Sequence, residues 1–156
     1  MVFLFDFSRV ILFPKDPNYS DSLNALYKDH KDEENFDFFK YFRLNDELVI
    51  YLNSIKDTND LYMFTSDIIQ DAPELQPTVD SLFKKVFSAS KMGTNKALPE
   101  AYTMIVKDLG VDVKELVYID DSLVNIEAAK NAGLQTIQYT NNEKLLSKLT
   151  EYVQKH

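Results

Sequence analysis

Residue types that can form a catalytic site follow apolar segments at several points of this sequence. The first is Asp6, which comes directly after the apolar run Val2-Phe3-Leu4-Phe5. A continuous apolar run fits a strand that is buried on both faces. An ionised carboxylate at the end of such a strand needs partners or a metal ion. The alternative for Asp6, taken alone, is a carboxylate that caps a turn.

A pair of adjacent acids, Asp120-Asp121, ends another apolar run. Adjacent carboxylates repel each other, and a hard divalent cation such as Mg²⁺ relieves that repulsion. The simpler alternative is that the pair caps the following helix. Because Asp6 would end on a neighbouring strand, we expect the three acids to share a metal site.

A hydroxyl and a lysine complete the set. Thr65 ends an apolar run, and Lys96 lies on a loop beyond a strand. Each has an ordinary interpretation, a satisfied strand-end hydroxyl for Thr65 and a solvated cation for Lys96. Together with the carboxylates they make a phosphate site. In such a site the metal and the lysine neutralise phosphoryl oxygens, the hydroxyl donates a hydrogen bond, and a carboxylate attacks in line.

Strands alternate with helices along the chain, and this alternation predicts an α/β domain with a parallel sheet. The expected strands are residues 2–6, 61–64, 86–87, 116–119 and 134–137, and the main expected helices are 45–55, 75–83, 99–109, 126–132 and 142–154. Ligands of such sheets bind beyond the carboxyl ends of the strands. The polar residues named above all lie just after a strand or on the loop beyond one.

Length and composition limit the classes of protein. The 156 residues fit one domain, with 45% hydrophobic and 27% charged residues, and the net charge of −8 argues against nucleic acid or an anionic membrane as a partner. There is no Cys, and the two histidines have no metal-ligand spacing. Asp6 and Arg9 interrupt the N-terminal apolar run, which also lacks a basic leader. We therefore expect a soluble, cytoplasmic protein.

Residues 14–44 form a different kind of segment, the insert. Pro14 and Pro17 take the chain out of the sheet, and Asp21-Ser22 can cap a short helix. A charged run then leads to an aromatic cluster of Phe36, Phe38, Phe39, Tyr41 and Phe42. We expect this cluster to pack the insert against the main body rather than to bind a ligand.

The order of these residues resembles the haloacid dehalogenase superfamily of aspartate-nucleophile hydrolases. The family has four motifs: an apolar strand followed by Asp-x-Asp, an apolar strand ending in Thr or Ser, a Lys before a helix, and an apolar strand ending in paired acids. Here they read Phe5-Asp6-Phe7-Ser8, Met63-Phe64-Thr65, Lys96-Ala97-Leu98-Pro99-Glu100-Ala101-Tyr102, and Tyr118-Ile119-Asp120-Asp121-Ser122 with Asn125 and Ala132-Gly133 after it. The fourth motif is the most specific.

The resemblance implies a Rossmann-like parallel sheet flanked by helices, formed by residues 1–13 and 45–156. Residues 14–44 would then be a reduced helical cap of the type found in capped subfamily I. A homodimer through this cap is one further expectation, because a small cap leaves the site open or completed by a partner subunit.

The resemblance also implies roles for single residues. Asp6 would be the nucleophile that forms an aspartyl-phosphate, and the phosphate would be held by Thr65, Ser66 and Lys96. Mg²⁺ would be held by Asp6, the backbone carbonyl of Ser8 and Asp121, with Asp120 close by or acting through water. The substrate would be a small phosphorylated metabolite.

Two residues depart from the family pattern. Ser8 replaces the second Asp of the first motif, which in family phosphatases protonates the leaving oxygen and later activates the water. A serine does neither at neutral pH, and general acid–base catalysis contributes roughly 10²- to 10⁴-fold to a rate. Arg9 stands where Gly is usual; it adds a cation near the site or is an ordinary exposed Arg. We therefore expect a slow phosphatase.

Three functions stay open at this stage. The first is a Mg²⁺-dependent hydrolase that acts on a small phosphate ester, slowed by Ser8. The second is a catalytically silent binding or regulatory protein that keeps the fold. The third is a dehalogenase or phosphonate hydrolase, since such branches of the superfamily also lack the second Asp.

Overall fold

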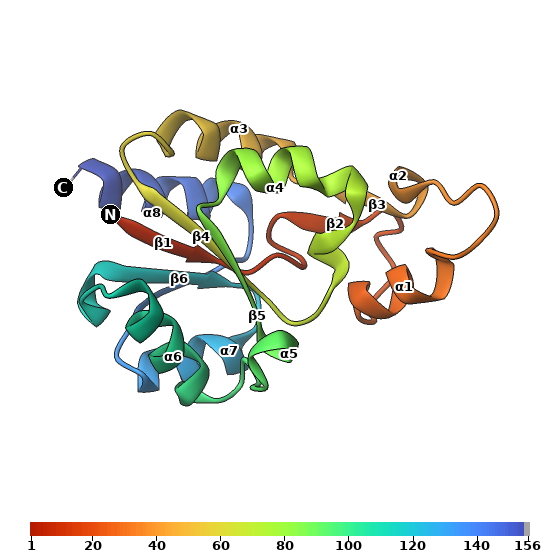
Figure 1. Ribbon diagram of the computed structural model, residues 1–156. Helices are drawn as coiled ribbons and strands as arrows, with labels where there is room; N and C mark the ends of the chain where they lie inside the picture. Colours follow the sequence, from red (N-terminus) through yellow and green to blue (C-terminus); the bar gives the residue numbers. More distant parts are fainter. Residues whose placement is uncertain (155–156) are drawn as a thin grey trace.

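The computed structural model describes residues 1–154, and Lys155 and His156 lie outside the described residues. Five parallel strands form one sheet in the order β5-β4-β1-β6-β7 (Figure 1). The strands are β1 (Val2–Phe5), β4 (Asp60–Thr65), β5 (Lys85–Ser88), β6 (Leu116–Asp120) and β7 (Gln135–Gln138). Helices cover both faces of the sheet, so the predicted α/β, Rossmann-like fold class is confirmed.

The strand β1 lies in the middle of the sheet, between β4 and β6. Its residues Phe3, Leu4 and Phe5 have no exposed surface, as expected for an apolar run that is buried on both faces. Successive side chains of a strand point to opposite faces, and accordingly Phe3 and Phe5 belong to one core cluster and Leu4 to the other. Asp6, which follows β1, therefore lies between the carboxyl ends of β4 and β6.

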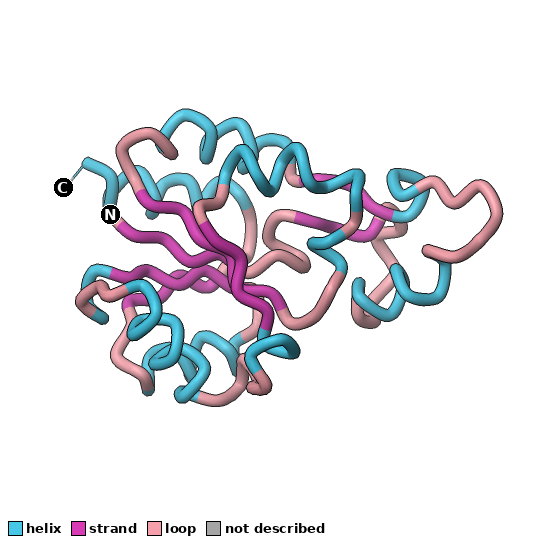
Figure 2. Tube along the Cα trace, viewed as in Figure 1, coloured by secondary structure: helices cyan, strands magenta, loops and turns pink. Residues whose placement is uncertain are grey.

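Two helical layers enclose the sheet (Figures 1 and 2). One layer contains α3 (Asp46–Ile55), α4 (Gln76–Leu82) and α8 (Asn142–Gln154), and the other contains α5 (Ala89–Met92), α6 (Pro99–Leu109) and α7 (Leu123–Asn131). Short 3₁₀ helices are η1 (Ile69–Asp71), η2 (Pro73–Leu75) and η3 (Val113–Glu115). Within residues 1–154, none of the helices is both long and apolar enough to cross a membrane.

Local signals in the sequence set several helix boundaries. The side chain of Asn45 accepts a hydrogen bond from the backbone N–H of Leu48 and so caps α3. Pro99 begins α6, because a proline at the first helical position loses no hydrogen bond. Gly110 ends the same helix in the left-handed conformation, with a φ of 66°. These predicted boundaries are confirmed.

A two-stranded antiparallel sheet, which the sequence did not predict, follows β1. Its strands are β2 (Leu12–Pro14) and β3 (Phe42–Leu44). The chain reaches β2 through a tight turn, in which the backbone N–H groups of Val10, Ile11 and Leu12 all donate to the carbonyl oxygen of Phe7. This hairpin brings the two ends of the insert together and leads it away from the parallel sheet.

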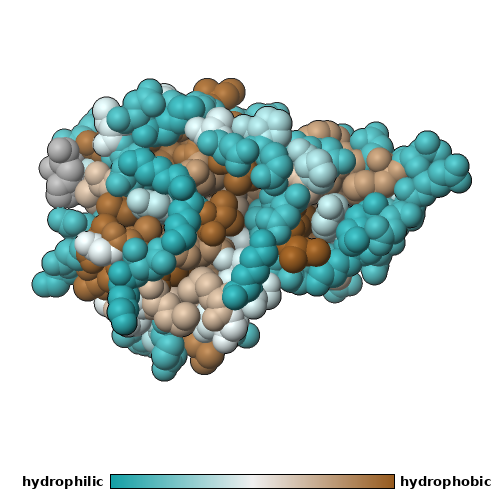
Figure 3. Space-filling view, in the orientation of Figure 1, coloured by the Kyte–Doolittle hydropathy of each residue, from teal (hydrophilic) through white to brown (hydrophobic). Residues whose placement is uncertain are grey.

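The insert contains two short helices, α1 (Leu23–His30) and α2 (Phe38–Tyr41), and projects past the carboxyl ends of the parallel strands (Figures 1 and 2). Phe38 and Phe42 are buried, with ring centroids 4.6 Å apart, and both belong to the same core cluster as Phe3. The prediction that the aromatic residues pack the insert against the main body is confirmed for Phe38 and Phe42, whereas Phe39 is exposed. The outer end of the insert carries hydrophilic side chains (Figure 3).

Candidate active site

A buried lysine joins two carboxylates at the carboxyl edge of the sheet. Lys96, on the loop before α6, donates a hydrogen bond of 2.5 Å from its Nζ to Oδ1 of Asp6. The same Nζ lies 3.0 Å from Oδ2 of Asp120, at the end of β6. The exposed fractions are 5% for Asp6, 4% for Lys96 and 0% for Asp120. Buried charges of this kind stabilise each other, because burial removes the water that would otherwise solvate them.

A third carboxylate lies beside this pair. Carboxylate oxygens of Asp6, Asp120 and Asp121 all lie within 4.8 Å of one another. Three acids with one lysine leave a net negative charge, and oxygen ligands are those that a hard divalent cation prefers. The donor set therefore fits Mg²⁺ in both charge and chemistry.

The protonation of these groups follows from burial and neighbouring charge. Burial raises the pKa of Asp6 to about 7, against the opposing charge of Lys96 and with the added repulsion of Asp120. Burial and the charge of Asp120 raise the pKa of Asp121 to about 6. Burial alone would lower the pKa of Lys96, but the charges of Asp6 and Asp120 outweigh it and raise that pKa. Lys96 therefore stays positively charged, and its single charge only partly balances the negative charges of the three acids.

The two adjacent acids have different surroundings. Asp120 accepts hydrogen bonds from the Tyr118 hydroxyl, from Nδ2 of Asn125 at 3.0 Å and from the backbone N–H of Ser122 at 2.8 Å, in addition to its contact with Lys96. Asp121 is only partly buried. The lone pairs of Asp120 are therefore largely committed within the protein, and Asp121 is the member of the pair that is better placed for a ligand from solvent.

Two buried tyrosines, Tyr102 and Tyr118, contact groups of the site, although their residue types alone predicted no role for them. The Tyr102 hydroxyl donates to the backbone carbonyl of Lys96 at 2.7 Å and lies 3.2 Å from that of Asn125, which holds the lysine loop against α7. Burial and the charge of Asp120 raise the pKa of Tyr118 well above its ordinary value, so its hydroxyl remains a donor. The spacing of two between Tyr118 and Asp120 on a strand places both on one face and could have predicted their contact.

The hydroxyl of Thr65, at the end of β4, makes no hydrogen bond to Lys96. Its hydroxyl donates instead to Oε1 of Gln70 at 3.0 Å, and both side chains are buried. Nothing in the sequence pattern signalled Gln70. The neighbouring Ser66 is exposed and lines a cavity of about 200 Å³ together with Lys96 and Asn125. Of the predicted phosphate-binding residues, Ser66 and Lys96 thus share a cavity, whereas the Thr65 hydroxyl is bonded to Gln70.

The two residues that depart from the family pattern lie in the turn after β1. Ser8 forms a β-bridge with Leu12 and is partly buried. Arg9 has a positive φ of 61°, a conformation that favours glycine. Its guanidinium donates to the carbonyl oxygens of Tyr19 at 2.9 Å and Asp21 at 3.1 Å. Arg9 therefore ties the insert to the turn, and its hydrogen bonds go to the insert rather than to the carboxylates.

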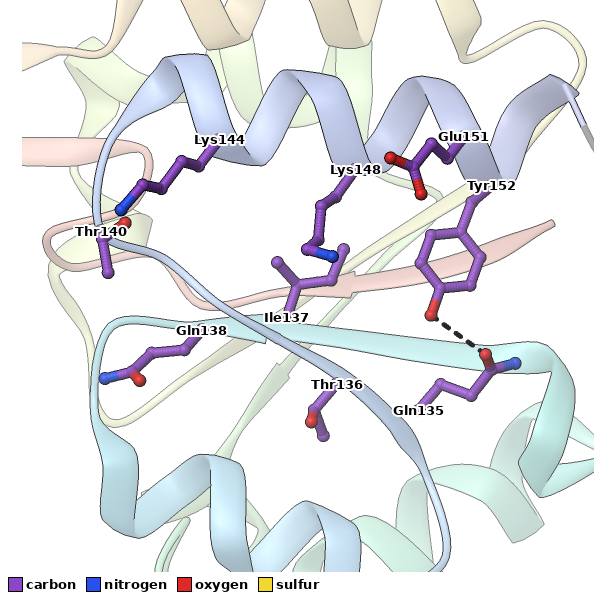
Figure 4. Close-up of a pocket in the computed structure, with 9 residues that line it drawn as sticks. All are labelled: Gln135, Thr136, Ile137, Gln138, Thr140, Lys144, Lys148, Glu151 and Tyr152. Carbon is purple, nitrogen blue, oxygen red and sulfur yellow. Dashed lines mark hydrogen bonds between the residues drawn. The ribbon is translucent and has the colours of Figure 1, made fainter.

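A larger groove, of about 580 Å³, lies between β7 and α8 (Figure 4). Lys144, Lys148 and Glu151 of α8 line it opposite Thr136 of β7, and the Tyr152 hydroxyl donates to Gln135 at 3.1 Å. It contains none of the predicted site residues and only one acid. We therefore place the chemistry at the carboxyl edge of the sheet, where three carboxylates lie close to Lys96, which also lines the smaller cavity.

Solved structures share this fold. A predicted hydrolase of the haloacid dehalogenase-like (HAD-like) family from Porphyromonas gingivalis is 18% identical, with a TM-score of 0.69, and the match covers 96% of each chain. A HAD family enzyme from Bacteroides thetaiotaomicron, solved in complex with magnesium and inorganic phosphate, is 16% identical, with a TM-score of 0.65 over 89% of this chain and 93% of that one. At these identities the likeness shows the fold.

Sequence comparison shows the family. Drimenol cyclase drtB of Aspergillus calidoustus is 26% identical over 70 residues, which are 45% of this chain, and the match spans only 13% of that much longer protein. The model of the haloacid dehalogenase-like hydrolases matches residues 13–133, which is most of the chain. The match begins after Asp6, and the geometry at Asp6, Lys96 and the acid pair is consistent with it. The chain belongs to the haloacid dehalogenase-like hydrolase family.

Proposed function

We propose that this protein is a Mg²⁺-dependent hydrolase that acts on a small phosphate ester, a phosphorylated metabolite, through an aspartyl-phosphate on Asp6. The observation that carries the proposal is the buried contact of Lys96 with both Asp6 and Asp120. A lysine held between two acids at the edge of a parallel sheet is poised to neutralise the oxygens of a phosphoryl group.

The hydrogen bonds of Asp6 favour one of its oxygens as the nucleophile. Within residues 1–154, the backbone N–H of Phe7 at 2.7 Å and Lys96 both donate to Oδ1. These two bonds occupy Oδ1 and leave Oδ2 to attack the phosphorus. The attack forms the bond between Oδ2 and phosphorus while the ester bond breaks.

The metal would be held by Asp6, Asp121 and the backbone carbonyl of Ser8, with Asp120 close by or acting through water. The three carboxylates fit a cation, as described above, and the related enzyme from B. thetaiotaomicron was solved with magnesium and phosphate. When bound, Mg²⁺ supplies positive charge to the phosphoryl oxygens. Asp120, which accepts three further hydrogen bonds, would mainly orient Lys96 and Asn125.

We expect the turnover of esters to be slow because Ser8 offers no proton at neutral pH. The departing alkoxide needs a proton, and among residues 1–154 the titratable side chains that act on Asp6 are Lys96, Asp120 and Asp121. The lysine is committed to two acids, and both acids belong to the metal site. A missing general acid–base residue costs roughly 10²- to 10⁴-fold in rate.

The test is phosphate release from a panel of phosphate monoesters, with and without Mg²⁺. We expect slow release by the natural protein, none by Asp6→Asn, and faster release by Ser8→Asp. Ser54→Asp, on the exposed face of α3, adds the same charge away from the site and should behave like the natural protein.

Other results would favour the alternatives. If neither the natural protein nor Ser8→Asp releases phosphate from any ester, the silent binding or regulatory protein becomes the leading function. Release of halide or cleavage of a phosphonate by the natural protein, again abolished by Asp6→Asn, would favour the third function. The homodimer through the insert stays a prediction, which size-exclusion chromatography with light scattering can test.

A further inference from the structure

The strand β7 forms one edge of the parallel sheet and, among the described residues, pairs with β6 alone. The backbone N–H of Tyr139, just after β7, donates to the carbonyl oxygen of Asp120 at 2.9 Å, so every second residue counted back from Tyr139 directs its backbone toward β6. The N–H and C=O groups of Thr136 and Gln138 point the other way, out of the sheet. An open edge of this kind is a template on which a further strand can pair.

The groove of about 580 Å³ runs along this open edge, between β7 and α8 (Figure 4). Lys144 and Lys148 are exposed, and their side chains reach from α8 toward β7. Within residues 1–154 neither ammonium group makes an ion pair. At the opposite edge of the sheet, by contrast, Lys85 of β5 pairs with Asp108 at 2.5 Å. Glu151 is the single acid that lines the groove, which is therefore positive although the chain carries a net charge of −8.

We propose that this edge binds an extended acidic segment of another protein, which adds to β7 as a further strand. The outward backbone groups of Thr136 and Gln138 would make the hydrogen bonds, and Lys144 and Lys148 would pair with acidic side chains. The inference is independent of the proposed function, because the carboxylates assigned to phosphate chemistry do not line this groove.

The spacing of the two lysines fits the side chains of an added strand. Residues four apart on a helix have Cβ atoms about 5–6 Å apart, and residues two apart on a strand are separated by about 6.6–6.8 Å on the same face. Ile137 packs in the same core cluster as Leu145 and Leu149, so α8 covers the face of the sheet to which Ile137 points. Alternate acidic side chains on that face of the added strand can therefore each meet one lysine.

A second copy of this chain fits the edge less well than an acidic segment. Antiparallel pairing of two β7 edges about a two-fold axis would bring two identical grooves together. The lysines of both copies would then approach each other, and two chains that each carry a net charge of −8 repel as they approach. The charge of the groove therefore favours an acidic partner over self-association.

The first experiment measures binding of the full chain to a short fluorescein-labelled peptide of alternating glutamate and valine by fluorescence anisotropy. We expect binding that weakens as the salt concentration rises. Lys144→Gln and Lys148→Gln should each raise the Kd roughly 1.5- to 5-fold, the range of an exposed ion pair. The control Lys107→Gln removes an exposed lysine of α6 that does not line the groove and should bind like the natural protein.

A second experiment tests whether the peptide pairs with the strand. In heteronuclear NMR the amide hydrogens of Thr136 and Gln138 should exchange more slowly with solvent when the peptide is bound. The amide of Tyr139, already bonded to Asp120, is the internal control and should change little. The same peptide with N-methyl groups on the residues that face β7 should bind roughly tenfold more weakly, because it cannot donate these hydrogen bonds.

Several results would overturn the inference. Absence of binding at millimolar peptide would show that the lysines only keep other strands away from the edge. Equal binding of a lysine–valine peptide would refute the charge recognition, and equal binding of the N-methylated peptide would refute strand addition. A dimer in light scattering that Gln138→Pro, which removes an outward N–H, converts into a monomer would show that a second copy occupies the edge. Phosphate release is a separate measurement, so failure of this inference leaves the proposed function intact.

Discussion

The hydroxyl of Thr65 donates a hydrogen bond of 3.0 Å to the side-chain carbonyl of Gln70, and both side chains are 1% exposed. The amide of Gln70 in turn donates to the backbone carbonyl of Asp67 at 2.6 Å. The only hydrogen of the Thr65 hydroxyl is therefore already used inside the loop after β4. A phosphoryl oxygen, which only accepts hydrogen bonds, must displace Gln70 before Thr65 can donate to it.

The pair should be energetically coupled, and a double-mutant cycle measures the coupling. Thr65→Val removes the hydroxyl at nearly constant size, and Gln70→Met removes the acceptor. Each single change leaves a buried polar partner unpaired and should cost about 1–3 kcal/mol in the free energy of unfolding. The double variant should recover about 0.5–3 kcal/mol relative to the sum of the singles. Urea unfolding of the four proteins tests this, and strictly additive losses would contradict a direct interaction.

A second prediction concerns Asn24, which fastens the insert to the same loop. Its side-chain Oδ1 accepts hydrogen bonds from the backbone N–H groups of Ile68 at 3.0 Å and Ile69 at 2.9 Å, and its side chain is buried. Asn24→Ala leaves both N–H groups without this acceptor and should lower the free energy of unfolding by about 1–3 kcal/mol.

Two matched variants test whether the lost acceptor oxygen, and not the loss of an asparagine from a helix, lowers the stability. Asn24→Asp keeps an acceptor oxygen and should lose less stability than Asn24→Ala. Asn53→Ala changes an exposed asparagine on α3 and should have little effect. Urea unfolding measures all three, together with limited proteolysis of the insert. Equal stability of Asn24→Ala and Asn53→Ala would show that the buried contact contributes nothing.

The sequence predicted those parts of the site that follow from strand order. Parallel strands end at the same edge, so Asp6, Thr65 and the acids could be placed together from apolar runs alone. Local signals likewise predicted the caps at Asn45 and Gly110. These features depend on residues that are adjacent in sequence or on a periodicity that one strand displays.

Contacts between distant, irregular segments could not be predicted in this way. The hairpin partners Leu12–Pro14 and Phe42–Leu44 are three residues each, and 27 residues (15–41) separate them. Such strands are too short to show alternation, and Pro14 reads as a breaker. The contact of Thr65 with Gln70 depends on the path of a loop, and that path is set by packing and not by propensity. The hydrogen bonds of Arg9 to the insert could not be predicted for the same reason.

The acid cluster makes a third prediction, on pH and metal. The folded-state pKa values of Asp6, about 7, and Asp121, about 6, lie above the ordinary value of 3.8. Between these limits the folded protein binds more protons than the unfolded chain, so the metal-free free energy of unfolding should fall as pH rises from about 4 to about 7. Mg²⁺ binds the deprotonated acids, so it should counter this fall and bind more tightly at higher pH.

Urea unfolding at several pH values, with EDTA or with Mg²⁺, tests this prediction. Asp6→Asn removes one of the raised groups and should flatten the metal-free profile. A metal-free protein that becomes more stable from pH 4 to pH 7, or a profile that Mg²⁺ leaves unchanged, would be inconsistent with an acid cluster whose negative charge the protein alone does not balance. Isothermal titration calorimetry with Mg²⁺ at the same pH values gives the affinity independently.

The last prediction follows from the backbone of Arg9, which combines a left-handed conformation with two hydrogen bonds to the insert. Replacing alanine by glycine in ordinary positions lowers stability, because glycine has the more flexible unfolded chain. At a φ of 61° the order should invert, since Cβ is strained there by about 1–2 kcal/mol. Arg9→Gly should therefore be more stable than Arg9→Ala, although both lose the guanidinium contacts to Tyr19 and Asp21. Urea unfolding compares the two variants, with phosphate release from monoesters as a second readout. Because the Arg9 guanidinium donates to the insert, phosphate release should persist in both variants, and its loss would place Arg9 in the reaction instead.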